Sequence, residues 1–78
     1  MPVVLLFAQA REAAGSASVR VEGSTVREVT SALAARYGTE MEQVVAASRI
    51  WRNGDPVAPD DEVADDDEVA VLPPVSGG

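Results

Sequence analysis

Residues 68–78 read EVAVLPPVSGG, a short apolar segment followed by two prolines and, at the last two positions, two glycines. The pattern of Glu68–Leu72 predicts a β-strand, and Pro73-Pro74 ends it because proline donates no hydrogen bond to a strand ladder. Val3–Ala8 (VVLLFA) is an unbroken apolar run, typical of a central strand buried on both faces. We therefore expect these first and last strands to be central neighbours, and to be parallel if the chain crosses over between them.

The segments that follow the first strand change from a strand period to a helical one. Ser18–Glu22 alternates and predicts a half-buried strand, antiparallel to the first. Thr25–Glu28 has the spacing of a capping box, in which the threonine hydroxyl accepts from a free backbone N–H and the glutamate reaches back. A second box at Thr39–Glu42 predicts a shorter helix. The main helix is expected to end at Gly38 and to carry four apolar residues at helical spacing, Val26, Val29, Leu33 and Tyr37.

The region after the helices predicts a hairpin. Arg49–Arg52 (RIWR) is interpreted as a strand, Asn53-Gly54 is a strong two-residue turn signal, and Pro56–Ala58 is the short return at a sheet edge. The order of elements predicts a two-layer α+β domain over residues 1–72, with a mixed sheet of about four to five strands packed on one main helix and one short helix. Residues 73–78 are predicted to form a projecting tail.

The composition excludes several kinds of site. The 78 residues include no cysteine and no histidine, which removes disulfides, Cys/His zinc sites, thiol nucleophiles and imidazole bases. The formal charge is −7, with eight acids and no base in residues 53–78. This excess of acid argues against a nucleic-acid partner and favours a basic protein surface. The apolar run at residues 3–8 is far too short for a membrane span, and the missing disulfides favour a cytoplasmic location.

The carboxylates and aromatic side chains predict little chemistry of their own. The run DDEVADDDEV (residues 60–69) lacks the glycine and the ligand alternation of an EF-hand loop, so we interpret it as a solvated loop rather than a metal site. A domain of this size has little room for two carboxylates facing each other across a pocket, which disfavours a hydrolase. Tyr37 is predicted in the core, Phe7 and Trp51 fit either the core or the surface, and Leu72 is expected in an exposed apolar patch.

The tail is the one feature with a predicted reactive role. Pro73-Pro74 stiffens the chain as it leaves the sheet, and six extended residues reach on the order of 20 Å. Gly77 and Gly78 carry no Cβ atoms, so the end of the tail can pass where other residues do not fit. The carboxylate of Gly78 is therefore the predicted reactive group, as the substrate of another protein's active site.

These features resemble a known family. MPVVLLFAQAREAAG at the start and DEVAVLPPVSGG at the end are similar to the small subunit of molybdopterin synthase, which is one of the ubiquitin-like sulfur carriers with the β-grasp fold. The most specific matches are Phe7-Ala8-Gln9, Arg11-Glu12 and the PPVSGG ending. The family often has a glycine in the turn before the last strand (GDEV), where this chain has Asp66. We expect this turn to be kept, because aspartate tolerates the left-handed conformation at slight cost.

The resemblance implies a cycle of activation and sulfur transfer. An adenylating enzyme uses ATP to activate the carboxylate of Gly78, and a sulfur donor converts it to a thiocarboxylate. The tail then enters the large subunit of the synthase, a heterotetramer in this family, where two sulfur deliveries to the pterin precursor form the dithiolene of molybdopterin. The chain itself is expected to bind no cofactor and no metal, and to act as a sulfur-donating subunit without autonomous activity.

The resemblance also implies roles for individual residues. Gly78 carries the sulfur and Gly77 permits entry of the tail. The approach to them is lined by Pro73, Pro74, Val75 and Ser76. Apolar contacts with the partner are implied at Phe7 and Leu72, and less directly at Pro56 and Val57.

Two alternatives stay open at this point. A sulfur carrier for thiamin, cysteine or tRNA thiolation would share the fold and the Gly-Gly ending. A ubiquitin-like modifier or interaction module would instead form isopeptide bonds with lysines of other proteins, or act without its tail. Gene neighbourhood and co-purification with a large subunit distinguish these readings.

Overall fold

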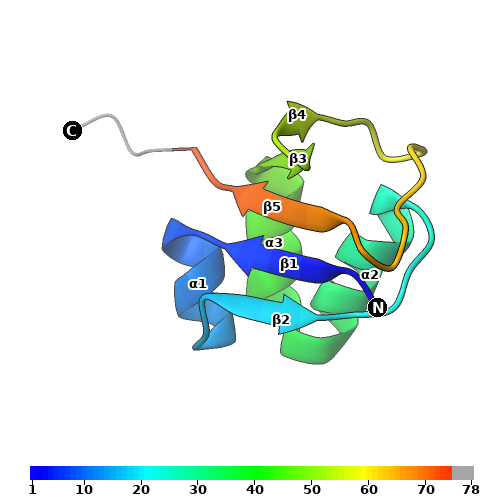
Figure 1. Cartoon of the computed structure of the whole chain (residues 1–78). Coiled ribbons are helices and arrows are strands. Elements are labelled where there is room, and N and C mark those ends of the chain that lie inside the picture. The colour runs from blue at the N-terminus through cyan, green and yellow to red at the C-terminus, as the bar shows by residue number, and fades with distance from the viewer. Residues whose placement is uncertain (75–78) are drawn as a thin grey trace.

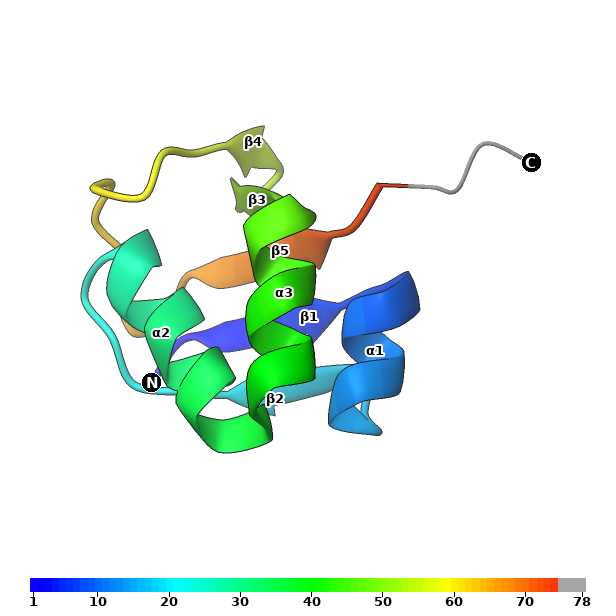
Figure 2. The same ribbon diagram turned by 180° about the vertical axis from the view of Figure 1, so that it is seen from behind.

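The computed structural model describes residues 1–74 and shows a mixed sheet with three helices on one of its faces (Figures 1 and 2). The sheet order is β2-β1-β5-β3-β4, with β1 and β5 parallel in the centre and the other neighbours antiparallel. This arrangement confirms the predicted α+β fold. The strands are β1 (Val3–Leu6), β2 (Ser18–Arg20), β3 (Arg49–Arg52), β4 (Asp55–Pro56) and β5 (Glu68–Leu72). The helices are α1 (Ala8–Ala14), α2 (Val26–Tyr37) and α3 (Thr39–Ala47).

Alternate residues of the two central strands build the core. Val4 and Leu6 of β1 pair with Val69 and Val71 of β5, and all four are at most 1% exposed. They pack with Leu33 and the other buried apolar residues of the helices. The intervening residues of β1 are only half-buried. The prediction that the first strand is buried on both faces was therefore wrong, because the helices cover only one face of the sheet.

The helix α1 was missed in the sequence, where the first strand was expected to run to Ala8. The strand ends at Leu6, and α1 begins at Ala8 with Phe7 as its N-terminal cap. The sequence AQAREAA consists of strong helix formers, and Gly15 follows it in the left-handed conformation that ends many helices. The local sequence therefore favoured a helix here. The one buried residue of α1 is Ala10.

The predicted start of α2 is confirmed with one change of partner. The Thr25 hydroxyl accepts a hydrogen bond from the backbone N–H of Glu28 (3.1 Å), as in a capping box. The Glu28 carboxylate reaches back to Ser24 and accepts from both its N–H (2.9 Å) and its hydroxyl (3.0 Å). These bonds hold the pKa of Glu28 below its ordinary value. The second box was wrong, because Gly38 caps α3 and Thr39 already lies inside that helix without a side-chain capping bond.

The turn inside the β3–β4 hairpin agrees with the prediction, and the turn before β5 agrees with it in part. Asn53 and Gly54 both have positive φ, 51° and 87°, which confirms the tight two-residue turn between β3 and β4. The turn before β5 is closed by the N–H of Asp67 donating to the carbonyl of Ala64 (3.1 Å). This turn is therefore present, as expected. However, Asp66 does not adopt the left-handed conformation, since Ala8 and Asn53 are the only non-glycine residues of 1–74 with positive φ.

Gly23 is a position where the fold has no room for a side chain. Its φ is +154°, and an added Cβ would lie 2.8 Å from both the backbone nitrogen and a methyl group of Val29. Gly23→Ala should lower the free energy of unfolding by about 1–3 kcal/mol, because the helix start must shift. The measurement is urea unfolding followed by circular dichroism. Gly15→Ala is the matched control, since Gly15 also has positive φ (+73°) but open space around it. Equal losses in the two variants would contradict the steric explanation.

Candidate functional site

The candidate site begins where β5 ends. Leu72 is the last strand residue, and the half-buried Pro73 and the exposed Pro74 carry the chain off the end of the central strand. Figure 1 shows this tail root leaving beside the C-terminal end of β1, where α1 begins. Val75, Ser76, Gly77 and Gly78 lie outside the described residues, so their roles stay predictions.

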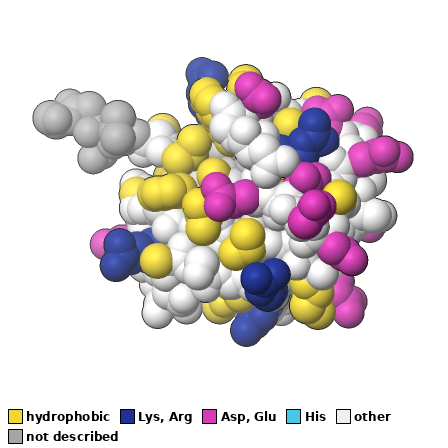
Figure 3. Space-filling view, viewed as in Figure 1, with side chains coloured by type: hydrophobic (Ala, Val, Ile, Leu, Met, Phe, Trp, Pro, Cys, Tyr) yellow, Lys and Arg dark blue, Asp and Glu magenta, His cyan; other side chains and the backbone are white. Residues whose placement is uncertain are grey.

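The face of the sheet without helices carries a row of apolar side chains. Cross-strand partners share a face, and the pairs Leu5–Ala70, Ala70–Trp51 and Trp51–Pro56 extend this row over four strands. Leu72 lies on the same face two residues after Ala70. We call Leu5, Trp51, Ala70 and Leu72 the open-face patch. Figure 3 shows hydrophobic side chains gathered toward the tail side of this face and acidic side chains toward the opposite side.

The predicted contact residues occupy different places around the patch. Phe7 is 44% exposed and follows β1 directly, at the end of the sheet from which the tail leaves. Pro56 is exposed and is the cross-strand partner of Trp51. Val57 is half-buried and packs against the core from the edge of the sheet. The structure thus places Phe7, Leu72 and Pro56 around the open face, whereas Val57 belongs to the helix side.

Trp51 and Leu5 are members of the patch that the sequence did not assign to it. Trp51 is half-buried, and its indole N–H has no hydrogen-bond acceptor within residues 1–74. The alternation of β3 alone does not say which of its two faces meets the helices. The pairing of Trp51 with Ala70 places it on the open face, and this register was not readable from one strand.

Both edges of the sheet offer few free backbone groups to another strand. The Ser16 hydroxyl donates to the carbonyl of Ser18 (2.8 Å) and accepts from its N–H (3.4 Å), which occupies both backbone groups of this β2 residue. The guanidinium of Arg36 donates to the carbonyl of Arg20 (3.3 Å). At the other edge, Pro56 has no N–H to offer. A partner is therefore expected to recognise the face of the sheet and the tail rather than an edge strand.

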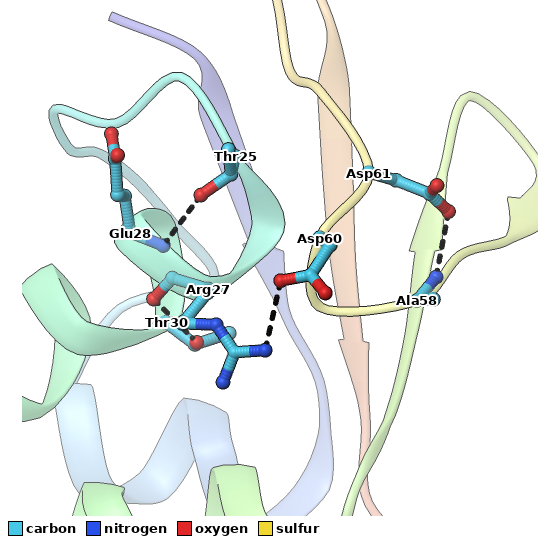
Figure 4. Close-up of polar contacts among 7 residues, drawn as sticks. All are labelled: Thr25, Arg27, Glu28, Thr30, Ala58, Asp60 and Asp61. Carbon is cyan, nitrogen blue, oxygen red and sulfur yellow. Dashed lines mark hydrogen bonds and ion pairs between the residues drawn. The ribbon is translucent and has the colours of Figure 1, made fainter.

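The acidic loop between β4 and β5 has a structural role. Its Asp60 forms an ion pair with Arg27 of α2 (2.9 Å), and its Asp61 accepts from the N–H of Ala58 (2.7 Å), as Figure 4 shows. The first backbone N–H groups of α2 also donate into this loop, to the carbonyls of Asp61 and Pro59. The loop thereby satisfies a helix N-terminus. Within residues 1–74, no three or more aspartate or glutamate side chains are grouped so that they could hold a metal ion together.

Asp67 connects the hairpin to the start of β5. Its carboxylate accepts from the N–H of Ala64 (2.7 Å) and from the side-chain amide of Asn53 (2.8 Å). Asn53 in turn accepts from the N–H of Glu68 (2.8 Å). The bond from Ala64, and after it the bond from Asn53, holds the pKa of Asp67 below its ordinary value.

Replacing Asp67 should make the free energy of unfolding less dependent on pH in the acid range. A carboxyl group whose pKa is lowered by folding stabilises the protein above its unfolded value, about 3.9, and loses that contribution as pH falls through the lowered pKa. Asp67→Asn should therefore be less stable than wild type at pH 7, and the difference should shrink in acid. The test is to measure the urea midpoints of the two proteins at pH 7 and in acid. Asp66→Asn is the control, and a gap for Asp67→Asn that stays constant with pH would contradict the assignment.

The comparison with known proteins is made at the level of family and fold. Residues 4–78 match the model of the ThiS family. The chain belongs to this family. It is therefore a ubiquitin-like sulfur carrier with the β-grasp fold, as predicted. No curated protein sequence matches it significantly. Within the described part of this ThiS-family chain, no helix is long and apolar enough to cross a membrane.

Three solved structures show how closely the ThiS-family chain follows its relatives. SAMP1 from Haloferax volcanii is 34% identical with a TM-score of 0.86, over 97% of both chains. A Pyrococcus furiosus protein provisionally named molybdopterin converting factor subunit 1 is 31% identical (TM-score 0.82, 94% of this chain and 95% of that one). CysO from Amycolatopsis orientalis, solved in complex with BexX, is 25% identical (TM-score 0.85, 100% of both chains). SAMP1, the molybdopterin converting factor subunit and CysO are named for different roles. Membership of the family therefore does not identify the molecule that accepts the sulfur.

Proposed function

We propose that this chain is the sulfur-carrying small subunit of molybdopterin synthase. The observation that carries the proposal is the tail root, where a central strand ends in Pro73-Pro74 beside an apolar face, in a ThiS-family sequence that ends in PPVSGG. The 31% identity to the Pyrococcus furiosus protein supports the choice of pathway. The partners are then the large synthase subunit, in a heterotetramer, and an adenylating enzyme. All of them would be cytoplasmic.

The chemistry takes place at the carboxylate of Gly78. A carboxylate oxygen attacks the α-phosphate of ATP on the adenylating enzyme, which gives the acyl adenylate and releases pyrophosphate. A sulfide equivalent from the sulfur donor then adds to the carbonyl carbon, and AMP leaves to give the thiocarboxylate. Its sulfur forms a bond to an electrophilic carbon of the pterin precursor and displaces an oxygen substituent from that carbon, which gives a thioester. Water then cleaves the acyl–sulfur bond, so that the carboxylate of Gly78 is regenerated and the sulfur stays on the precursor as a thiolate. Two deliveries form the dithiolene.

The residues of this chain deliver and orient the sulfur. The sequence has no cysteine and no histidine to act as nucleophile or base. Holding the reacting group in position is itself a large contribution to rate. We assign that contribution to the stiff tail root and to the open-face patch, and we assign binding of ATP to the adenylating enzyme.

Intact-mass measurement tests the proposal. The purified chain is incubated with ATP, the adenylating enzyme and a sulfur donor. We expect a mass gain that corresponds to replacement of one oxygen by sulfur, and transfer of that sulfur when the large subunit and the pterin precursor are added. Absence of the gain with an enzyme that activates a known carrier would refute the function.

A second candidate is a protein modifier. The identity of 34% to SAMP1, which is named a small archaeal modifier protein, favours it. A modifier would join Gly78 to lysine side chains of other proteins through isopeptide bonds. Isopeptide-linked remnants in digested cell extracts, without a stable complex with a large synthase subunit, would select this candidate. A carrier for cysteine synthesis, suggested by the CysO structure, would deliver its sulfur to a different acceptor in the same assay.

A change in the open-face patch should weaken the complex with the large subunit. Leu72→Asp places a charge in the patch, and we expect the dissociation constant to rise at least about tenfold, because removing a carboxylate from water against an apolar partner surface costs more than about 1.4 kcal/mol. The fold should persist, since Arg49 is the cross-strand partner of Leu72. Calorimetric titration measures the effect. Ala35→Asp, on the exposed side of α2, is the control, and equal affinities would contradict a role for the patch.

A further inference from the structure

The join between β1 and α1 contains an unusual backbone conformation. Ala8 has a φ of +48°, and the only other non-glycine residue of 1–74 with positive φ is Asn53, in a hairpin turn that favours it. A residue with a Cβ rarely adopts this conformation, and alanine lacks the short polar side chain that helps asparagine to do so. Ala8 is exposed, so burial of its methyl group does not explain the conformation. Such outliers persist where the surrounding structure imposes them, and they concentrate at functional sites.

The neighbours of Ala8 show what the conformation achieves. Phe7, the residue before it, is still extended, with φ −120° and ψ 153°. The carbonyl of Phe7 nevertheless accepts from the N–H groups of Ala10 (3.0 Å) and Arg11 (3.4 Å), which are the first hydrogen bonds of α1. The chain therefore changes from strand to helix within one residue, and Ala8 makes the change. It then turns toward the face of the sheet that the helices cover (Figures 1 and 2).

This sharp change of direction leaves Phe7 on the open face of the sheet. Side chains alternate between the two faces of an extended chain, so Phe7 lies on the same face as Leu5. The parallel register pairs Leu6 with Val71, and its next step brings Phe7 level with Leu72. Phe7 is 44% exposed there, at the end of the sheet from which the tail leaves. An exposed aromatic ring and a leucine therefore lie together at the tail root.

We propose that Ala8 is a positioning residue for the interface with the large subunit, because its positive φ fixes Phe7 beside Leu72 before the partner arrives. The inference rests on the proposed function. Aromatic anchors supply much of the energy of an interface, and a side chain that is already in place loses less conformational entropy on binding. A residue that cannot adopt positive φ at position 8 forces the chain to turn elsewhere, which moves Phe7 relative to the tail root.

Nuclear magnetic resonance of the free chain tests the position of Phe7. Ala8→Val disfavours positive φ because its Cβ is branched, whereas Ala8→Gly permits it because glycine has no Cβ. We expect nuclear Overhauser contacts between the Phe7 ring and the Leu72 methyl groups in wild type and Ala8→Gly, and their loss in Ala8→Val. Ala35→Val is the control, since Ala35 is also exposed but lies in α2 without positive φ. Contacts that persist unchanged in Ala8→Val would overturn the proposal.

The glycine variants give a second result, which does not require Ala8→Val to fold. Glycine relieves the unfavourable conformation at position 8, whereas at an ordinary helical position it only weakens the helix. The urea midpoint of Ala8→Gly should therefore stay close to that of wild type, and the midpoint of Ala35→Gly should fall. A fall in Ala8→Gly as large as that in Ala35→Gly would contradict the strained conformation on which the proposal depends.

A double-mutant cycle extends the test to the complex. Calorimetric titration with the large subunit compares wild type, Phe7→Ala, Ala8→Val and the combined variant, after circular dichroism melts have verified that each is folded. We expect the dissociation constant to rise about tenfold in each single variant. Once the Phe7 ring is absent, Ala8→Val should change it by less than about twofold, because it acts through that ring. Ala8→Gly should bind within about threefold of wild type.

The outcomes separate this inference from the proposed function. If wild type does not bind the large subunit, the proposed function fails, and the resonance measurements on the free chain still decide whether Ala8 positions Phe7. If wild type binds and Ala8→Val binds as tightly as Ala35→Val, the positioning role is wrong while the function stands. An equal effect of Ala8→Val with and without the Phe7 ring would show a general disturbance of the fold and would also overturn the proposal.

Discussion

Deletion of Gly78 should abolish thiocarboxylate formation. Removal of one residue withdraws the terminal carboxylate by about 3.4 Å, and catalysis falls by about 100-fold for a misplacement of only about 1 Å. The chain has no cysteine that could carry the sulfur instead. We therefore expect no mass gain after prolonged incubation with ATP, the adenylating enzyme and the sulfur donor. Because residues 1–74 are unchanged, the truncated chain should still bind both partners.

Gly78→Ala is the matched control for the deletion. It keeps the length of the tail and adds only one methyl group, so it should be activated slowly rather than not at all. Single-turnover mass measurements compare the three proteins at equal partner concentration. A deletion variant that gains sulfur at the wild-type rate would show that the reactive group is not the carboxylate of Gly78.

Leu33→Ala should produce the largest loss of stability among single core substitutions in α2. Leu33 is 0% exposed and packs in the core beneath the sheet. Truncation of a buried leucine costs about 2–5 kcal/mol, because transfer energy is lost and a cavity remains. A small domain has a total of only about 5–15 kcal/mol, so a large part of its stability would disappear. The single tryptophan, Trp51, allows unfolding to be followed by fluorescence in urea.

Leu72→Ala makes the same chemical change at a half-buried position and is the control. Its loss should be smaller than that of Leu33→Ala, because the open face gives the leucine fewer contacts to lose. A stability loss in Leu72→Ala as large as that in Leu33→Ala would mean that the open face is packed as tightly as the core. It would then be a poor docking surface.

Several parts of the fold follow from local patterns. The period of Val26, Val29 and Leu33, the cap at Thr25 and the end at Gly38 define α2 within one short stretch. The two residues of the β3–β4 turn and the two prolines after β5 are equally local signals. The predictions were wrong where a local sequence pattern was compatible with two different structures. The apolar run of β1 did not reveal where the strand stops, and Thr39–Glu42 matched a capping box although Gly38 already capped the helix.

The candidate site divides in the same way. The sequence alone points to the tail, because its composition excludes the other reactive groups and because a PPVSGG ending needs no neighbours to be recognised. It could not place Trp51 and Leu5 on either side of Ala70, or Ala47 and Pro74 in the lining of one pocket, since these residues are far apart along the chain. Strand register and helix packing set such distances. The central strands β1 and β5 carry apolar residues on both faces, and only the position of the helices makes one face the core and the other a surface for partners.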